Sequence, residues 1–452
     1  MRRLTEMLFL MTFSLTGLLT STVAQTNIGG YWEGVIADAG RELRFNVEFR
    51  VEFNGEPNQL KGRIDVPDLY IFDYALANVR YESGKIHFEL PLGREPEQFE
   101  GVLTNENIAG KYSGRFYKEE PHPAIFRLWR EHRDVRYTRE TVTFPSGPSG
   151  EVKLAGTLFV PLKKGAHPAI VFFHGSGPQT RESYLRYFAD LFARRGFATL
   201  IYDKRGAGES TGPNWYRTGD NFDNLVADAL SGVQFLCNRN DIDRRRVGLW
   251  GLSQGGWLAP LAAVRSQDIA FLIAISGGGV TPAEQELYDD EVKLRDRGFP
   301  EDQISQAVAL LKMADDVIRK KVNWEEFAAA RTRAQQQPWY PLLDRFPLKL
   351  PREDGSWLAG SAQLDFDPRP VWQQVKVPVF AIFGEADKST PSPESARRIE
   401  LALKQGGNKH YRVEVVPDAD HGLWVASKPG RWDWDRPAPG WVEKVARWAE
   451  KQ

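Results

Sequence analysis

The segment Arg246-Val-Gly-Leu-Trp-Gly-Leu-Ser-Gln-Gly-Gly-Trp-Leu-Ala-Pro260 has the layout of a strand that turns into a helix. A short apolar run leads into Ser253, and small residues typical of a helix start follow it. Glycine at 251 and 255 removes the side chains that would clash where a strand turns sharply into a helix. The layout predicts a nucleophile elbow, in which the Ser253 hydroxyl stands clear of the sheet edge.

The same Gly-x-Ser-x-Gly pattern occurs a second time, at Gly208-Glu-Ser-Thr-Gly212. Ser210 lies well beyond the nearest strand-like run, residues 197–202, in a loop with three glycines and Pro213. No strand leads directly into Ser210, and no helix follows it at once. Because a nucleophile elbow requires a strand, a turn and a helix, Ser253 is the predicted nucleophile and Ser210 the alternative.

Length and charge narrow the class of protein. A chain of 452 residues is too long for one ordinary core, so we expect two or three domains. The 59 basic and 60 acidic residues nearly balance, and no basic cluster is interleaved with aromatic residues. This argues against nucleic acid as a partner and favours a small, weakly charged molecule.

The N-terminus has the organisation of an export signal. Arg2 and Arg3 precede an apolar stretch, residues 7–19. The small residues of Thr22-Val-Ala24 follow, and they suit cleavage by signal peptidase. The stretch is short of the roughly 20 residues that span a membrane. We expect residues 1–24 to be a cleaved signal peptide and the mature protein to be secreted or periplasmic, without stable membrane insertion. An uncleaved anchor is the alternative.

Residues 25–135 are expected to form a β-rich N-terminal domain and its linker. Apolar and polar residues alternate in short runs separated by turn signals such as Ser83-Gly84, at 31–36, 43–49, 85–90 and 99–103. This period predicts a small antiparallel β-sandwich or barrel. It contains no catalytic grouping, so it either shields the second domain or binds carbohydrate, lipid or protein. The proline-containing stretch 118–150 is expected to include the linker.

The pattern changes after this point. Strand-like runs at 169–173, 197–202, 247–250, 271–275 and 377–383 alternate with helical stretches at 183–195, 221–237, 254–265 and 392–405. This alternation predicts an α/β fold, a mostly parallel sheet with helices on both faces, over residues 136–280 and 371–452. Ligands of such sheets bind at the carboxyl ends of the strands.

Residues 281–370 interrupt this alternation. Thr281-Pro-Ala-Glu284 and Asn323-Trp-Glu-Glu326 have the sequence of helix N-termini, and we expect helices near 282–297, 300–320 and 324–336. An insertion that directly follows a strand emerges at the carboxyl edge, so a helical lid is predicted. A passive surface appendage is the alternative. Gly277-Gly278-Gly279 is interpreted as a hinge into this insertion.

A serine nucleophile needs a base and an acid that orients the base. Of the seven histidines, His421 alone follows a strand and loop and precedes a glycine, so it is the predicted base. Asp387 follows the run 377–383 into a turn and is the predicted acid, whereas Glu385 in the same turn is the alternative. Asp387 could instead only stabilise that turn.

An oxyanion hole also requires two backbone N–H groups that face the developing negative charge. One is expected from Gln254, at the positive end of a helix. The other is expected from the loop after residues 169–173, with the amide of Ser176 preferred and that of Gly177 second. His174 in this loop is interpreted as a structural anchor. Neither a cofactor nor a metal site is predicted, because no His-Glu-x-x-His motif and no cysteine cluster exists.

Five motifs in this order, HGSG at 174–177, DKRGAGESTG at 203–212, GLSQGG at 251–256, FGEADKSTP at 383–391 and DADHG at 418–422, carry a family resemblance. The chain resembles the bacterial secreted esterases of the α/β-hydrolase superfamily with an N-terminal β-rich domain. The resemblance covers roughly residues 150–452. It implies carboxylic ester hydrolysis through an acyl-serine intermediate, with Ser253, Asp387 and His421 at the triad positions and in the chain order of that superfamily.

Three other functions remain open. A serine peptidase related to prolyl oligopeptidase shares the fold, although the β-rich region is too short for the propeller of those peptidases. A thioesterase uses the same chemistry, but export away from cytoplasmic coenzyme A argues against it. An inactive binding protein is disfavoured because every expected triad residue is present.

Overall fold

The computed structural model describes residues 28–38, 41–52, 59–92, 95–114, 124–131, 136–213, 221–343, 348, 363–426 and 436–452. They belong to two compact units, the first comprising the described residues up to 135 together with Arg436, the second residues 136–426 and 437–452. The expected signal peptide, residues 1–24, lies outside the described residues. Over the described ranges, no helix is long and apolar enough to cross a membrane.

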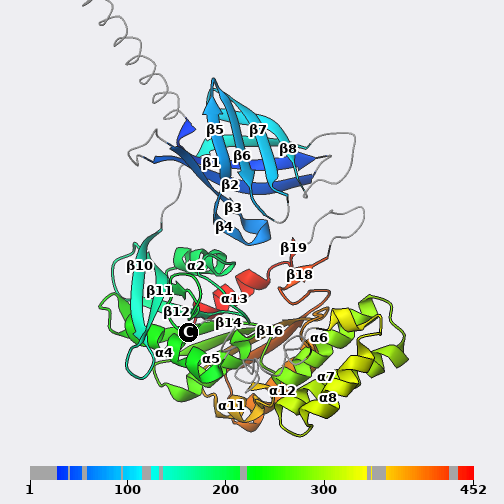
Figure 1. Cartoon of the computed structure of the whole chain (residues 1–452). Coiled ribbons are helices and arrows are strands. Elements are labelled where there is room, and N and C mark those ends of the chain that lie inside the picture. The colour runs from blue at the N-terminus through cyan, green and yellow to red at the C-terminus, as the bar shows by residue number, and fades with distance from the viewer. Residues whose placement is uncertain are drawn as a thin grey trace, which may run out of the picture. The chain divides into compact units, whose positions relative to one another are not determined.

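The N-terminal unit is one antiparallel sheet of nine strands (Figure 1). The strands are β1 (Gly30–Asp38), β2 (Arg41–Glu52), β3 (Gln59–Val66), β4 (Ile71–Ala75), β5 (Ala77–Glu82), β6 (Lys85–Leu90), β7 (Glu97–Thr104), β8 (Asn107–Ser113) and β9 (Ile125–Glu131), with the short 3-10 helix η1 (Pro67–Leu69) between β3 and β4. Except for β4 and β5, strands that are consecutive in the chain pair with each other, and β1 also pairs with β9. Only Leu76 separates the two edge strands, β4 and β5, in sequence. The sheet therefore curls into a nearly closed barrel.

Aromatic side chains fill the interior of this barrel. Phe45, Phe88, Phe99 and Phe126 are buried, and the rings of Phe88 and Phe99 stack with centroids 4.5 Å apart. These side chains occupy inward positions on β2, β6, β7 and β9. Inward and outward residues alternate along each strand, which is the period of two seen in the sequence. The prediction of a small antiparallel β domain is confirmed, and of its two forms the barrel describes it better than the sandwich.

The second unit is built on an eight-stranded sheet with strand order β10-β11-β13-β12-β14-β15-β16-β17. The strands are β10 (Tyr137–Ser146), β11 (Val152–Pro161), β12 (His167–Phe173), β13 (Ala198–Tyr202), β14 (Ile242–Leu252), β15 (Phe271–Ile275), β16 (Val379–Gly384) and β17 (Tyr411–Val416). The six strands from β13 to β17 in this order run parallel, and β10 and β11 are antiparallel to their neighbours. A two-stranded sheet of β18 (Trp424–Val425) and β19 (Arg436–Pro437) follows.

The stretch 118–150, which was expected to include the linker, also contains a strand that the sequence analysis did not predict. β10 lies within that stretch and pairs along its length with β11. Pro145, which suggested a linker, lies opposite Lys153 in this pair. Proline is tolerated there because β10 is an edge strand, so its missing N–H breaks no ladder on the outer side.

Helices cover both faces of the sheet (Figure 1). They are α2 (Leu185–Arg194), α4 (Phe222–Cys237), α5 (Gly255–Arg265), α11 (Arg369–Gln374), α12 (Ser392–Gln405) and α13 (Trp441–Ala449). Val171 of β12 shares a buried cluster with residues of α4, α5, α11 and α12. Its neighbour Phe172 contacts Phe192 of α2 on the opposite face. Burial on both faces explains why these strands are continuous apolar runs.

The insertion between β15 and β16 contains α6 (Pro282–Asp296), α7 (Glu301–Ile318), α8 (Trp324–Ala334) and the 3-10 helix η2 (Tyr340–Leu342). The three α-helices are those that the sequence predicted, and Thr281 and Glu284 form the expected capping box. They bury a cluster of their own, which includes Leu294, Leu311 and Phe327. The insertion is therefore a small helical body with its own core.

Candidate active site

Ser253 lies on the turn between β14 and α5 in an unusual backbone conformation. Its φ is 56°, in the left-handed region that residues other than glycine rarely adopt. The turn is held by the Ser253 N–H, which donates to the Ile275 carbonyl at 2.8 Å. A Cβ on Gly251 would lie 2.3 Å from the Gly255 carbonyl oxygen, so glycine is required at 251. These features are those of the predicted elbow.

Ser210 has a different environment. Its side chain is buried, accepts from the Ala155 N–H at 2.9 Å and donates to the Asp203 carbonyl at 2.7 Å. Both bonds tie its loop to β11 and to the end of β13. A hydroxyl whose proton and lone pair are engaged in backbone bonds acts as a structural bridge, which favours Ser253 over Ser210 as the reactive group.

Asp387 and His421 meet across the carboxyl ends of β16 and β17. Oδ2 of Asp387 lies 2.8 Å from Nδ1 of His421, and the aspartate side chain is fully buried. Its Oδ1 accepts from the N–H groups of Ser389 and Thr390, both at 2.8 Å, and its Oδ2 accepts from the Ser392 hydroxyl at 3.1 Å. These donors fix the carboxylate, which can therefore orient the imidazole.

Thr390 links this pair to the Ser253 turn. Its hydroxyl donates to the Ser276 carbonyl at 3.1 Å and lies 3.5 Å from Nδ1 of His421. Ser276 directly follows Ile275, whose carbonyl holds the Ser253 N–H. Within the described residues, no hydrogen bond joins the Ser253 hydroxyl to His421 itself. Such bonds commonly tighten only when a substrate is bound, so the contact of His421 with Ser253 stays a prediction.

The alternative acid, Glu385, points elsewhere. It is exposed, and its Oε2 accepts from the Asp418 N–H at 3.4 Å. Asp420, beside His421, shapes the histidine turn because its Oδ1 accepts from the N–H groups of Gly422 at 2.9 Å and Trp424 at 2.8 Å. Burial raises the pKa of the Asp420 carboxyl. Asp387 is thus the carboxylate bonded to the imidazole.

The two segments expected to stabilise a negative charge lie at the carboxyl ends of β12 and β14. Gln254 precedes the first residue of α5, and Ser176 and Gly177 follow β12. The Gly175 N–H donates to Oε1 of Gln179 at 3.2 Å, whereas the Ser176 N–H donates no hydrogen bond within the described part of the chain. His174 anchors this loop, because its buried ring donates through Nε2 to the Tyr202 carbonyl.

Comparison with known proteins identifies the family. A family model described as the alpha/beta hydrolase family matches residues 170–432. The chain belongs to the alpha/beta hydrolase family. It is 26% identical over 314 residues to the esterase EstD of Thermotoga maritima, covering 66% of each protein. It is 28% identical over 187 residues to the thiohydrolase aneE of Aspergillus aculeatus, covering 41% of this chain and 49% of that protein.

Solved structures also resemble this hydrolase. The structure of DcsB in complex with its substrate analogue has a TM-score of 0.45 and 17% identity, covering 70% of this chain and 99% of that one. At this distance the likeness concerns the fold alone. The family match makes the chain a hydrolase, and a fold alone does not determine which reaction a protein catalyses.

The hydrolase has a buried lysine that the sequence analysis did not single out. Lys204 is 3% exposed and follows β13, next to Asp203. Its Nζ donates to the carbonyls of Gly175 and Gly177, each at 3.1 Å, and to Oε1 of Gln254 at 2.9 Å. The signal was its position directly after a strand of the parallel sheet, where ligand-binding residues gather.

The insertion is fastened to the turn that carries Asp387. The Tyr288 hydroxyl of α6 donates to the Asp387 carbonyl at 2.9 Å, and Lys388 pairs with Asp296 at 2.5 Å. The three glycines before α6 have a packing role that differs from the expected hinge. A Cβ on Gly277 would lie 2.0 Å from the Ser253 carbonyl oxygen, and one on Gly279 would lie 2.3 Å from the Cα of Ser395.

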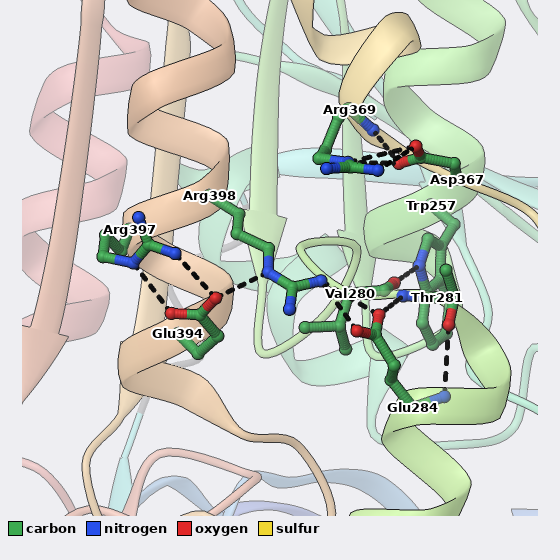
Figure 2. A network of polar contacts seen from close by, with 9 residues as sticks. All are labelled: Trp257, Val280, Thr281, Glu284, Asp367, Arg369, Glu394, Arg397 and Arg398. Carbon is green, nitrogen blue, oxygen red and sulfur yellow. Dashed lines mark hydrogen bonds and ion pairs between the residues drawn. The ribbon is translucent and has the colours of Figure 1, made fainter.

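A charged pocket of about 460 Å³ lies at the base of α6 and α12, and its lining does not include Ser253, Asp387 or His421. Figure 2 shows its paired side chains, which are Arg369, Arg397, Arg398, Glu284, Asp367 and Glu394. Arg398 of α12 bonds Glu284 of α6 at 2.9 Å and Glu394 at 2.6 Å. Hydrogen bonds from Arg397 and Arg398 lower the pKa of Glu394 to about 2. Because its arginines are bonded to carboxylates, we interpret this pocket as an interlock between helices.

Proposed function

We propose that this chain is a serine hydrolase that cleaves small carboxylic esters through an acyl intermediate on Ser253. The observation that carries the proposal is the 2.8 Å hydrogen bond between Asp387 and His421, beside a turn that holds a serine at a φ of 56°. The relative EstD, named as an esterase, supports the choice of ester. The N-terminal sequence supports export, so we propose that the mature enzyme is secreted or periplasmic.

The proposed reaction proceeds in two halves. Asp387 accepts a hydrogen bond from the Nδ1–H group of His421, which keeps this proton. Nε2 is therefore free to take the proton of the Ser253 hydroxyl as the serine oxygen bonds to the ester carbonyl carbon. The carbonyl oxygen becomes negative and accepts from the N–H groups of Gln254 and Ser176. As the tetrahedral intermediate collapses, the ester C–O bond breaks and the alcohol leaves with the proton from His421. Water then repeats the sequence on the acyl-serine and releases the acid.

A fluorophosphonate probe tests the nucleophile directly, because it bonds covalently to activated serines. We expect a single label on the wild-type protein, no label on Ser253→Ala, and undiminished labelling of Ser210→Ala. The two serines share one sequence pattern, so each variant is the matched control of the other. A label that persists on folded Ser253→Ala would refute the proposal.

The substrate class is tested by comparing turnover of p-nitrophenyl acetate, p-nitrophenyl palmitate, an S-acetyl thioester and an aminoacyl p-nitroanilide. We expect the short ester to have the highest kcat/KM. A preference for the anilide would favour the peptidase alternative, and a preference for the thioester the thioesterase.

A further inference from the structure

We propose that Lys204 is the positioning residue of the oxyanion site, where it aligns and polarises the Ser176 N–H. The inference rests on the proposed ester hydrolysis. In it, Lys204 acts on the backbone donors and does not itself contact the substrate. The inference is carried by three hydrogen bonds from one buried amine, to Gly175, Gly177 and Gln254.

Burial of a lysine amine needs a reason, because removing a charge from water is costly unless its protons are bonded. An ammonium group has three protons to donate, and the acceptors of Lys204 include two carbonyl oxygens and a side-chain amide oxygen. Two of them lie on the loop after β12 and the third on the residue that begins α5. Lys204 therefore joins the two segments that supply the expected oxyanion donors. Its own N–H also donates to the Gln179 carbonyl at 3.0 Å, at the far end of the loop.

The bond to Gly175 bears most directly on the chemistry. The Gly175 carbonyl and the Ser176 N–H belong to the same peptide group, which is planar and trans, so they point in opposite directions. With Lys204 on the carbonyl side, the Ser176 N–H faces away from the lysine. A donor on the carbonyl oxygen also draws electron density from the peptide and makes its N–H a stronger donor. The same bond thus sets the direction and the strength of the predicted oxyanion donor.

Gln254 is held in a related way. Its side chain accepts from Lys204 at 2.9 Å, while its backbone N–H is the expected second donor. Fixing this side chain against the Gly175–Gly177 loop sets the spacing between the two donors. Donor spacing matters because oxyanion stabilisation depends on groups that are in place before the charge develops.

The test uses Lys204→Met, which keeps the length of the side chain and removes its donors. With p-nitrophenyl acetate we expect kcat to fall about 10- to 100-fold, less than the 100- to 1000-fold loss caused by removing an oxyanion donor outright. KM should change little, because the ester carbonyl accumulates charge only in the transition state. Lys204→Arg keeps a donor for Gly175 and should recover part of kcat.

A second readout separates positioning from folding. Trifluoroacetophenone adds to an active serine, whose proton passes to the histidine, and the former carbonyl oxygen becomes an anion in the oxyanion site. Its inhibition constant should rise by the same factor as kcat falls. The matched control is Arg205→Met, which removes a neighbouring cation bonded to Asp228 at 2.6 Å and is expected to lower stability while kcat of the folded enzyme changes less than threefold.

The outcomes are distinct. If folded Lys204→Met keeps kcat and the inhibition constant within threefold of wild type, the inference is wrong while the proposed function stands. If the Met variant does not fold, Lys204→Gln, whose side chain is shorter and neutral, takes its place, and its kcat is expected to fall by at least about threefold. If Ser253→Ala remains active, the proposed function itself fails, whatever the lysine variants do.

Discussion

Two loops of this hydrolase share the pattern Gly-x-Ser-x-Gly and differ in every physical respect that bears on reactivity. At Ser253 the backbone is strained, with φ at 56°, and the side chain is partly exposed at the end of the central strand β14. At Ser210 the hydroxyl is buried and bonded to two backbone groups. The comparison teaches that the short pattern marks tight turns, and that a strand leading into the turn decides whether its serine is presented.

Each serine also has an aspartate in its surroundings, and the partners of these aspartates differ. Asp387 is bonded to His421, a side chain that can take up a proton near neutral pH. Asp203, whose carbonyl accepts from Ser210, is paired through its carboxylate with Arg181 at 2.5 Å. Arginine stays charged throughout the working range, so the second pair can only hold structure. Replacing the aspartate by asparagine should therefore lower turnover in the first pair and lower the free energy of unfolding in the second.

The largest expected effect follows from Asp387→Asn. Loss of the carboxylate removes the group that fixes the His421 tautomer, and turnover of p-nitrophenyl acetate should fall about 1000- to 10,000-fold. Glu385→Gln is the matched control, because this carboxylate lies in the same turn and is exposed. We expect the control to retain activity within threefold. Equal losses in the two variants would remove the special role of Asp387.

A smaller effect, on stability, is expected from Asp203→Asn. Its carboxylate accepts from the N–H groups of Arg181 and Glu209, both at 2.8 Å, in addition to the buried ion pair. Removing the buried partner leaves Arg181 with only the mostly exposed Glu209 as its partner, so unfolding free energy should drop by about 3 kcal/mol. Urea denaturation measures this drop. Glu209→Gln, which removes a mostly exposed partner of the same arginine, should cost less than about 1 kcal/mol.

Much of this arrangement could be predicted from the sequence because it depends on local patterns. Apolar runs bounded by turns located the strands β12 to β16, and capping residues located α6 and α8. His421 and Asp387 could be singled out because strands of a parallel sheet end at one edge. Their 2.8 Å contact confirms that the two side chains meet, while their catalytic roles stay a prediction.

Other features depend on contacts between distant residues that no local pattern encodes. β10 escaped prediction because Pro145 looks like a linker residue until its edge position in the sheet is known. Lys204 escaped because its three acceptors come from segments 27 to 50 residues away in the chain. The glycines before α6 suggested a hinge because glycine permits motion as well as close approach, and only packing against Ser253 and Ser395 distinguishes the two.

The smallest expected effect compares alanine and glycine at the two serines. At 253 the φ of 56° strains alanine but not glycine, so Ser253→Gly should be more stable than Ser253→Ala by about 1 kcal/mol. Ser210 is not among the residues with positive φ, and there the entropy of the unfolded chain should make Ser210→Gly less stable than Ser210→Ala by about 0.5–1 kcal/mol. Urea unfolding of the four variants measures both differences. Opposite signs are required, and the same sign at both positions would mean that strain does not distinguish the two loops.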